Sequence, residues 1–267
     1  MAVVNHPEDA VTSLKSILRT AAKRVVPESI LKMRRRWLLT RSVREVDHDL
    51  AGKPASEIFS EIYRRRLWGQ PADDRKFSSG HGSYMDLHVE PYVAAIGQFA
   101  RGLSRKPSVV DLGCGDFNVG SRIREYFGTY IACDVAPEVL EENRTRFAGL
   151  DVEFRQLDMI SDAYPEADVC IIRQVLQHLS NADISSVIRK VQKFQFLILT
   201  EPVPLGEFTP NLDQPTGVSS RLARGILSGV VLTEPPFSLQ VVSSQELCST
   251  FDDFSNARLV TTAFRLK

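Results

Sequence analysis

The stretch Val109-Val110-Asp111-Leu112-Gly113-Cys114-Gly115-Asp116 joins an apolar run to a turn with two glycines one residue apart. The apolar, β-branched run predicts a buried strand. Glycines at a strand-to-helix turn have no Cβ, so a ligand can lie directly against the backbone there. The stretch therefore predicts a ligand site at the carboxyl end of a strand. The kind of ligand has to be inferred from the residues around it in the sequence.

The residues that follow alternate short β-rich runs with helical ones, a pattern typical of a parallel sheet with crossover helices. Right-handed crossovers bring ligands to the carboxyl ends of such strands. We therefore expect an α/β fold with a doubly wound, mostly parallel sheet. The expected strands are Ser108–Leu112, Tyr130–Asp134, Val152–Leu157, Asp168–Ile172 and Phe194–Thr200. The expected helices are Ser121–Phe127, Pro137–Phe147 and Ala182–Val191, the last with Ser180 or Asn181 as N-cap.

Two helices are also expected upstream of the sheet, over Ala55–Trp68 and Glu90–Leu103, with a polar loop over Pro71–Ser83 between them. We divide the chain into a basic amphipathic helical extension (1–50) and one domain (51–267), made of a helical lid (51–105) and a sheet core (106–267) with an insertion near 204–240. The composition, 43% apolar and 25% charged, is that of a soluble protein. The N-terminus lacks the apolar core of a signal peptide, so we expect a cytoplasmic protein.

The formal net charge is zero, but its distribution is uneven. Val11–Arg41 contains nine basic residues and one acidic residue, Glu28, with apolar residues interleaved at helical spacing. A basic amphipathic helix pair of this kind can lie on an anionic bilayer, which would bring the protein to the inner membrane surface. Two alternatives stay open: the apolar stripe can cover the sheet domain, or the charges can bind RNA phosphates. Of the three, nucleic acid is the least favoured.

The charges around the glycine turn discriminate between nucleotide ligands. A dinucleotide site would have a third glycine at position 118, where this chain has Asn118, and would place a diphosphate on the helix N-terminus. Asp111 and Asp116 bracket the turn; carboxylates there repel a diphosphate but suit the ammonium group of a methionine moiety. We therefore prefer S-adenosylmethionine to NAD.

Carboxylates end the next two expected strands as well. Asp134 stands nineteen residues after Gly115, where a carboxylate can accept both ribose hydroxyls. Asp158 can accept from the adenine amine, with Met159 or Leu157 against the ring. Each acid alone could be a helix cap or turn residue, but the recurrence at successive strand ends favours a nucleoside site.

With these acids, Asp-Leu-Gly-Cys-Gly resembles the Rossmann-fold S-adenosylmethionine-dependent methyltransferases, over residues 75–267. That resemblance implies a seven-stranded sheet whose last strand is antiparallel. Further motifs resemble a bacterial subgroup associated with surface glycans and glycolipids: Trp68-Gly69, Ser79-Gly80-His81-Gly82-Ser83, Gly115-Asp116-Phe117-Asn118, Arg173 to Ser180, and Asn211 to Gly217 followed by Arg221. In this resemblance Ser79 to Ser83 close over the cofactor. The implied cofactor contacts are Ser79, Gly80, Asp111, Gly113, Cys114, Gly115, Asn118, Asp134, Val135, Asp158, Met159, Arg173 and Gln174.

Methyl transfer to a hydroxyl needs a base, and His178, six residues beyond the fourth expected strand, is the best candidate. The alternative is that its ring packs and hydrogen-bonds the backbone to shape the site. No cluster of His, Asp and Glu has metal-ligand spacing, and the four cysteines lack the pairing of a zinc site or disulfide framework. Candidate acceptor contacts are His81, Asn211, Asp213, Thr216 and Arg221, although an ordinary solvated loop would look similar at the last four.

The sequence thus predicts an enzyme, an O-methyltransferase acting on a sugar hydroxyl of a glycolipid or polysaccharide precursor. The residues Ile172-Arg173-Gln174-Val175 stand where relatives with base or amide nitrogen substrates carry an Asn/Asp-Pro-Pro-aromatic turn, which argues against base-amine methylation. Two alternatives remain: a methyltransferase for another small metabolite or for RNA, and a cofactor-binding protein without catalysis.

Overall fold

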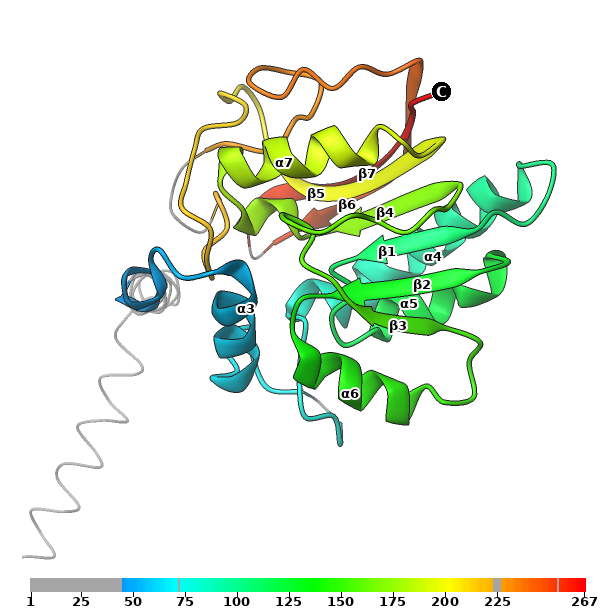
Figure 1. Ribbon diagram of the computed structural model, residues 1–267. Helices are drawn as coiled ribbons and strands as arrows, with labels where there is room; N and C mark the ends of the chain where they lie inside the picture. Colours follow the sequence, from blue (N-terminus) through cyan, green and yellow to red (C-terminus); the bar gives the residue numbers. More distant parts are fainter. Residues whose placement is uncertain (1–44, 72, 223–226, 254) are drawn as a thin grey trace, which may run out of the picture. The chain divides into compact units, whose positions relative to one another are not determined.

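A seven-stranded sheet forms the centre of the computed structural model (Figure 1), in the order β3-β2-β1-β4-β5-β7-β6. β1 to β5 run parallel to one another, and β7 pairs antiparallel with both β5 and β6. The expected seven-stranded, mostly parallel Rossmann-like sheet is therefore confirmed. The strands are β1 (Val109–Leu112), β2 (Tyr130–Asp134), β3 (Glu153–Gln156), β4 (Val169–Arg173), β5 (Phe196–Pro204), β6 (Ser243–Asp252) and β7 (Ala257–Arg265).

The structure describes residues 45–71, 73–222, 227–253 and 255–267. Val46–Lys267 form one compact unit. The predicted basic helices of Val11–Arg41 lie outside the described residues. Within the described part of the chain, no helix is long and apolar enough to cross a membrane.

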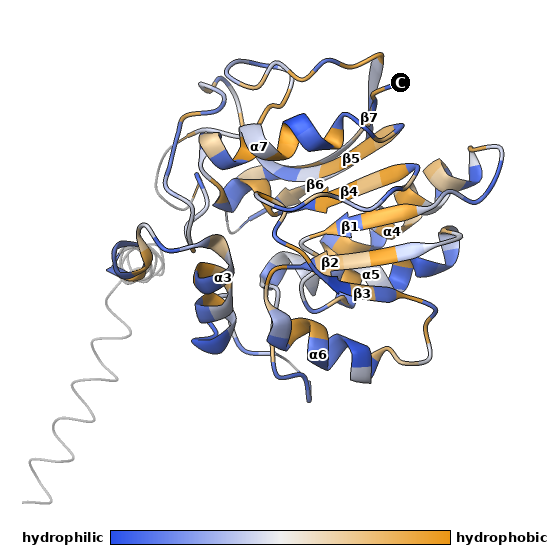
Figure 2. Ribbon diagram, in the orientation of Figure 1, coloured by the Kyte–Doolittle hydropathy of each residue, from blue (hydrophilic) through white to orange (hydrophobic). Residues whose placement is uncertain are grey.

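Helices cover both faces of the sheet (Figure 1). The α-helices are α3 (Ala55–Arg64), α4 (Asp86–Arg101), α5 (Asn118–Ile123), α6 (Pro137–Arg146) and α7 (Asn181–Val191). α4 and α5 pack Tyr92, Ile96 and Ile123 against one set of strand residues, which includes Val109, Tyr130 and Ile171. Side chains alternate along a strand, so the intervening apolar residues face the opposite layer, where α6 and α7 lie. The apolar strands between polar-surfaced helices stand out in Figure 2.

Three helices differ from the expected bounds by more than one residue. α5 covers Asn118–Ile123 where Ser121–Phe127 was expected, and the 3-10 turn η2 (Arg124–Tyr126) follows it. α4 and α3 differ for local reasons. α4 begins at Asp86, four residues earlier than predicted, although Pro91 lies inside it. The missing N–H of Pro91 frees the carbonyl of Leu87, and Leu87 is exposed, so water can satisfy it. α3 ends at Arg64 because Arg66 adopts a left-handed conformation (φ 55°), which turns Trp68 out of the helical path.

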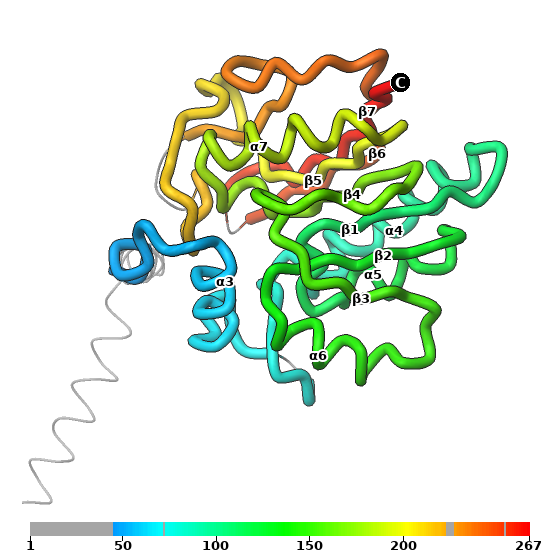
Figure 3. The backbone as a smooth tube through the Cα atoms, viewed as in Figure 1, coloured from blue at the N-terminus to red at the C-terminus, as the bar shows by residue number. Residues whose placement is uncertain are grey.

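β5 is longer than predicted and carries two prolines, Pro202 and Pro204. Its pairing with β4 ends at Arg173 and Thr200, while its pairing with β7 continues to Pro204. Beyond Thr200 the strand therefore has an open edge, where a proline without an N–H is tolerated. Residues 205–222 and 227–242 lie between β5 and β6, where the insertion was expected, and Figure 3 shows them, in yellow to orange, beside one end of α7.

Candidate functional site

The glycine turn after β1 is tightly packed. Gly113 and Gly115 both have positive φ, 75° and 56°. A Cβ on Gly113 would stand 2.6 Å from Val175 Cγ2, and one on Gly115 would overlap Ser79 Oγ. Both positions therefore require glycine for conformation and for space.

Asp134 ends β2 beside this turn and is only 6% exposed. Its Oδ2 accepts from the backbone N–H of Gly115 at 2.9 Å, and its Oδ1 accepts from that of Ala136 at 3.0 Å. Burial raises the pKa of Asp134, and the backbone N–H groups oppose that shift. Each carboxylate oxygen keeps a second lone pair, which suits two hydroxyls of a ribose.

Asp158 follows β3 and caps its own turn. Its Oδ1 accepts from Ile160 N–H at 2.8 Å and its Oδ2 from the Ser161 hydroxyl at 3.1 Å. Next to it, Met159 is buried, and its carbonyl accepts from Tyr164 Oη and Lys190 Nζ. Val135 offers its carbonyl to Gln156 Nε2 at 3.4 Å. Adenine contact by Asp158, Met159 and Val135 stays a prediction, and the turn-cap role of Asp158 is on its own enough to explain the carboxylate.

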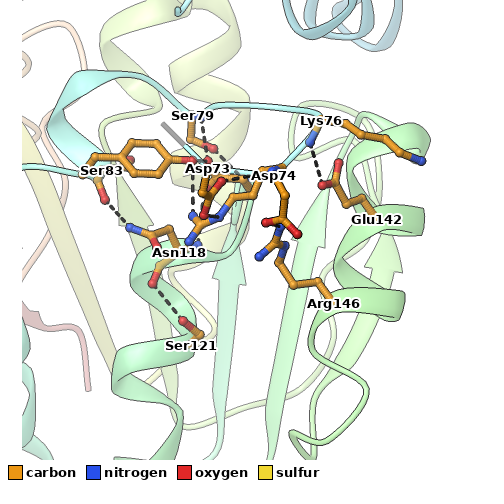
Figure 4. A network of polar contacts seen from close by, with 12 residues as sticks. Asp73, Asp74, Lys76, Ser79, Ser83, Asn118, Ser121, Glu142 and Arg146 are labelled. Carbon is orange, nitrogen blue, oxygen red and sulfur yellow. Dashed lines mark hydrogen bonds and ion pairs between the residues drawn. The ribbon is translucent and has the colours of Figure 1, made fainter. Parts of the chain in front are cut away.

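The segment 79–84 is fastened to the glycine turn (Figure 4). Ser79 N–H donates to Asp116 Oδ2 at 2.9 Å, Asp116 N–H donates to Ser79 Oγ at 2.8 Å, and the Tyr84 hydroxyl donates to the same carboxylate. Asn118 Nδ2 donates to the Ser83 carbonyl at 2.6 Å. The expected lid thus lies against the glycine turn. Asp116, predicted to suit an ammonium group, accepts hydrogen bonds from this segment, and Tyr84 is a partner that the sequence did not single out.

The same loop is also tied to α6. Arg146 forms an ion pair with Asp74, and Lys76 N–H donates to Glu142 Oε1 at 2.7 Å, as Figure 4 shows. Gly80 lies against Trp68, with its ideal Cβ position 3.7 Å from Trp68 Cβ. His81 opens the short 3-10 turn η1 (His81–Ser83) and is exposed. The loop therefore has contacts with the glycine turn, with α6 and with Trp68.

Arg173 and Gln174 end β4 and contact the lid at Gly82. Arg173 Nη2 donates to the Gly82 carbonyl at 2.8 Å, and its guanidinium lies 5.2 Å from the centre of the Tyr92 ring. Gln174 has a positive φ of 57°, and its side-chain amide occupies the space where a Cβ on Gly82 would stand. Arg173 Nε is buried and has no hydrogen-bond partner among the described residues. A carboxylate at this end of the site would satisfy it.

Asp111 and Cys114 are buried within the first strand and its turn. Asp111 accepts from the Tyr130 hydroxyl at 2.8 Å, and burial raises its pKa to about 6. Burial also raises the pKa of Cys114, so its thiol stays protonated at neutral pH. All four cysteines are free. The Asp111 carboxylate, predicted to attract an ammonium group, has the Tyr130 hydroxyl as a neutral partner on the α4 side of the sheet.

His178 lies in the 3-10 turn η3 (Leu176–His178) after β4, beside Trp68. The two rings are 5.2 Å apart between centroids and inclined by 45°. Burial lowers the pKa of His178 to about 4, although hydrogen bonds to the backbone of Val218 and Ser219 oppose the shift. The imidazole is therefore neutral at pH 7 and able to accept a proton. Both roles predicted for His178, base and structural, remain predictions.

Two buried carboxylates position this turn, and the sequence reasoning missed both. Glu201 on β5 accepts from Leu176 N–H at 2.8 Å and Gln177 N–H at 3.3 Å, and burial raises its pKa to about 8. Asp47 accepts from Val218 N–H at 2.7 Å and from the Ser219 hydroxyl. No local signal identifies Asp47, because its partners lie about 170 residues away in the chain.

The four polar residues of the insertion face protein groups. Asn211 Nδ2 donates to the carbonyls of Val231 and Pro235. Asp213 accepts from Asn181 N–H and Thr216 from Ser180 N–H, so both complete the N-terminus of α7. Arg221 is 1% exposed and donates to Leu212 O, Leu176 O and Asn181 Oδ1. The segment is not an ordinary solvated loop, and acceptor contact by these residues stays a prediction.

His88, a further histidine near the lid, packs away from this edge. It is buried on α4, and its Nδ1 lies 2.7 Å from Thr250 Oγ1 on β6. Across the described ranges, no group of three or more His, Cys, Asp or Glu side chains could hold a metal ion.

Known proteins similar to this chain share one kind of domain. Residues 109–194 match a family described as a methyltransferase domain. The chain carries a class I methyltransferase domain. Domains of this class take their methyl group from S-adenosylmethionine. Acetylserotonin O-methyltransferase of Bos taurus is 28% identical over 150 residues, which are 53% of this chain and 39% of that protein. The chain therefore spans well under half the length of this curated relative.

Solved structures agree on the fold of the methyltransferase domain. N-methyltransferase NodS of Bradyrhizobium japonicum WM9, in complex with S-adenosylhomocysteine, superposes with a TM-score of 0.57 at 13% identity, over 78% of this chain and 98% of that one. An S-adenosylmethionine-dependent methyltransferase of Leishmania major gives a TM-score of 0.53 at 16% identity, over 79% and 80%. At these identities the likeness shows the Rossmann-like methyltransferase fold.

The residues at this edge fit S-adenosylmethionine. The glycine turn leaves bare backbone, Asp134 offers two carboxylate oxygens, and Arg173 Nε is a buried donor that a carboxylate could satisfy. The turn, Asp134 and Arg173 come from the carboxyl ends of β1, β2 and β4. This edge thus offers a carboxylate that could hold a ribose and, apart from it, a buried donor that could hold a carboxylate.

Proposed function

We propose that this chain is an S-adenosylmethionine-dependent O-methyltransferase in which His178 accepts the proton of the acceptor hydroxyl. The observation that carries the proposal is the position of His178 in η3, just after the carboxyl end of β4, where burial keeps its imidazole neutral. A neutral histidine can take a proton as the hydroxyl oxygen attacks.

S-adenosylmethionine supplies a methyl group that is bonded to a positively charged sulfur. The acceptor attacks the methyl carbon in line with the C–S bond, and the sulfur is the leaving group. The chain's own residues align the partners. Asp134 binds the ribose, Arg173 holds the methionine carboxylate, and the Ser79–Ser83 segment excludes water from the glycine turn. Such positioning can supply about 7 to 11 kcal/mol of the barrier reduction.

For the acceptor, we propose a sugar hydroxyl of a glycolipid or polysaccharide precursor. The support is the set of subgroup motifs around Ser79, Gln174 and Asn211 together with a base suited to a hydroxyl. The bovine relative is named as an O-methyltransferase, which agrees with an oxygen acceptor, although the matched 150 residues cover only part of it. The structural neighbour NodS, an N-methyltransferase by its title, shares the fold and carries no information on the acceptor.

The basic stretch Val11–Arg41 leads us to propose a second contact, with the anionic inner membrane surface. Each Lys or Arg near such a surface contributes about 1 kcal/mol. Full-length protein should co-sediment with anionic liposomes in a salt-sensitive way, and a variant without residues 1–44 should not. Equal sedimentation of both proteins would refute this part of the proposal alone.

The test of the proposed reaction is a transfer assay with radiolabelled S-adenosylmethionine and bacterial lipid and glycan extracts as acceptors. His178→Ala should lower turnover by about 10² to 10⁴, while affinity for S-adenosylhomocysteine, measured by calorimetry, stays nearly unchanged. A folded His178→Ala protein with normal turnover would exclude the base. Loss of cofactor binding in this variant would favour the structural role instead.

A further inference from the structure

The neighbouring rings of Trp68 and His178 each carry one buried polar atom without a hydrogen-bond partner among the described residues. Their rings lie 5.2 Å apart. Trp68 Nε1 and His178 Nδ1 are both buried, and neither has a hydrogen-bond partner within the described residues. A buried polar atom without a partner is unfavourable and rare in native structures, so two such atoms on neighbouring rings point to a missing group that satisfies both.

The chemistry of the two atoms is complementary. The indole Nε1–H of tryptophan can only donate. A neutral imidazole has one nitrogen that donates and one that accepts. Nδ1 is the buried ring nitrogen without a partner among the described residues, and in the tautomer with the proton on Nε2 it is the acceptor. A group that satisfies both Trp68 Nε1–H and Nδ1 must then both accept and donate.

The pair lies next to the cofactor edge. Trp68 packs against Gly80 of the lid, and the edge of Trp68 meets the Tyr63 ring at a centroid distance of 5.2 Å. The Tyr63 hydroxyl in turn lies 3.1 Å from the ideal Cβ position of Gly115. A group held between Trp68 and His178 is therefore one side chain away from the glycine turn.

We propose that Trp68 Nε1–H and His178 Nδ1 together hold the hydroxyl that receives the methyl group. The indole donates to one lone pair of the hydroxyl oxygen, and the hydroxyl donates its proton to Nδ1. The second lone pair of the oxygen forms the new C–O bond as the C–S bond breaks, and the electron pair of that bond stays on sulfur. His178 keeps the proton as imidazolium until it is lost to solvent. This inference rests on the proposed O-methyl transfer and adds Trp68 as the residue that selects the acceptor atom.

The same geometry discriminates against amines. An amine nitrogen has a single lone pair, so it cannot accept from Trp68 and attack a methyl group at the same time. A hydroxyl oxygen can do both because it has two. Trp68 is thus expected to favour an oxygen acceptor over a nitrogen acceptor.

Trp68→Phe tests this role because it removes the N–H and keeps an aromatic ring beside His178. The probes are methyl hexopyranosides as hydroxyl acceptors and methyl 2-amino-2-deoxyhexopyranosides as amine acceptors, with labelled S-adenosylmethionine. We expect kcat/KM for O-methyl transfer to fall about five- to tenfold, the loss of one hydrogen bond, with the pH profile and the affinity for S-adenosylhomocysteine unchanged. Phe77→Leu, which alters the ring packed on Tyr63 at 6.0 Å and removes no polar atom, is the matched control. Full O-methyl transfer by a folded Trp68→Phe protein would overturn the proposal.

A direct readout comes from the indole N–H signals of ¹⁵N-labelled full-length protein. The chain has two tryptophans, so Trp37→Phe and Trp68→Phe assign both signals. In the complex with S-adenosylhomocysteine, methyl hexopyranosides should shift the Trp68 signal downfield and leave the Trp37 signal in place. A protein that binds S-adenosylhomocysteine but shows no Trp68 shift with any of these sugars would contradict the Trp68 role and leave the methyltransferase proposal intact. A protein that does not bind S-adenosylhomocysteine would overturn both.

Discussion

The lid-and-turn region (residues 73–84 and 113–118) and the insertion (205–242) are both rich in polar side chains, yet they use them differently. In the first, Ser79, Asp116 and Asn118 join two chain segments across the edge where the strands end. In the second, Asn211 and Arg221 turn inward and bond carbonyls of their own loops and of η3. Polar composition alone therefore does not mark a ligand site. A polar side chain is available to a ligand only where its hydrogen-bonding groups are not already paired with neighbouring backbone.

The largest difference between the two regions is expected for Arg221→Met. The change leaves three acceptors, Leu212 O, Leu176 O and Asn181 Oδ1, without their donor, and the bond to Leu176 O is buried. At about 1 to 3 kcal/mol for a buried unsatisfied group, we expect the free energy of unfolding to fall by ~2 kcal/mol or more. Denaturant unfolding measures this. Affinity for S-adenosylhomocysteine should change less than twofold. An equally stable variant that has lost acceptor turnover would instead make Arg221 a ligand contact.

His178 connects the two regions. Its backbone carbonyl accepts from Gly217 N–H of the insertion, and its ring lies beside Trp68, which contacts Gly80 of the lid-and-turn region. Its pKa is lowered to about 4, so the base is neutral and active above that pH and loses activity as pH falls through it. The protonation of His178 should therefore cause no change in kcat/KM between about pH 5 and 8, and kcat/KM should fall about tenfold per pH unit below 4. A profile of kcat/KM against pH in wild type checks this. An inflection near 6.5 that disappears in His178→Ala would show an exposed, unperturbed ring.

A smaller difference is expected when one side-chain hydroxyl is removed from each region. Ser79→Ala removes the acceptor for Asp116 N–H and loosens the lid, so S-adenosylhomocysteine should bind about fivefold more weakly, or ~1 kcal/mol. Thr216→Val removes the acceptor for Ser180 N–H in the insertion and should cost about the same in stability, without changing that affinity. Calorimetry and thermal unfolding of both variants make the comparison. Equal changes in affinity and in stability for the two variants would show that the two regions do not differ in this way.

The sequence predicted the sheet and the glycine turn because their signals are local. The strand runs, the glycine pair and the acid at the end of β2 can be found without tertiary knowledge, and the seven-stranded sheet confirms the expected fold. Trp68 was marked only by the Trp68-Gly69 motif. Its place beside His178 could not be found in this way, since His178 is 110 residues distant and the turn at Arg66 that displaces Trp68 from α3 is not visible in the helical spacing.

The insertion shows a different limit of local signals, because its predicted acceptor contacts remain untested. Asn211, Asp213, Thr216 and Arg221 have the residue types of sugar ligands, and nothing local reveals that the N-terminus of α7 and the buried carbonyls of η3 need the same donors and acceptors. Asp158 is intermediate, because a strand-end acid is equally suited to adenine and to the turn that it caps. Such residues can be separated only when their partners in the fold are known.

We propose that the glycine turn and Asp134 bind the nucleoside of S-adenosylmethionine. Calorimetric titration of S-adenosylhomocysteine into wild type and Asp134→Ala tests it most directly, with circular dichroism to show that the variant is folded. Loss of one or two charge-assisted hydrogen bonds, about 1.5 to 3 kcal/mol each, should weaken binding at least tenfold. Equal affinity in the two folded proteins would contradict nucleoside binding by Asp134.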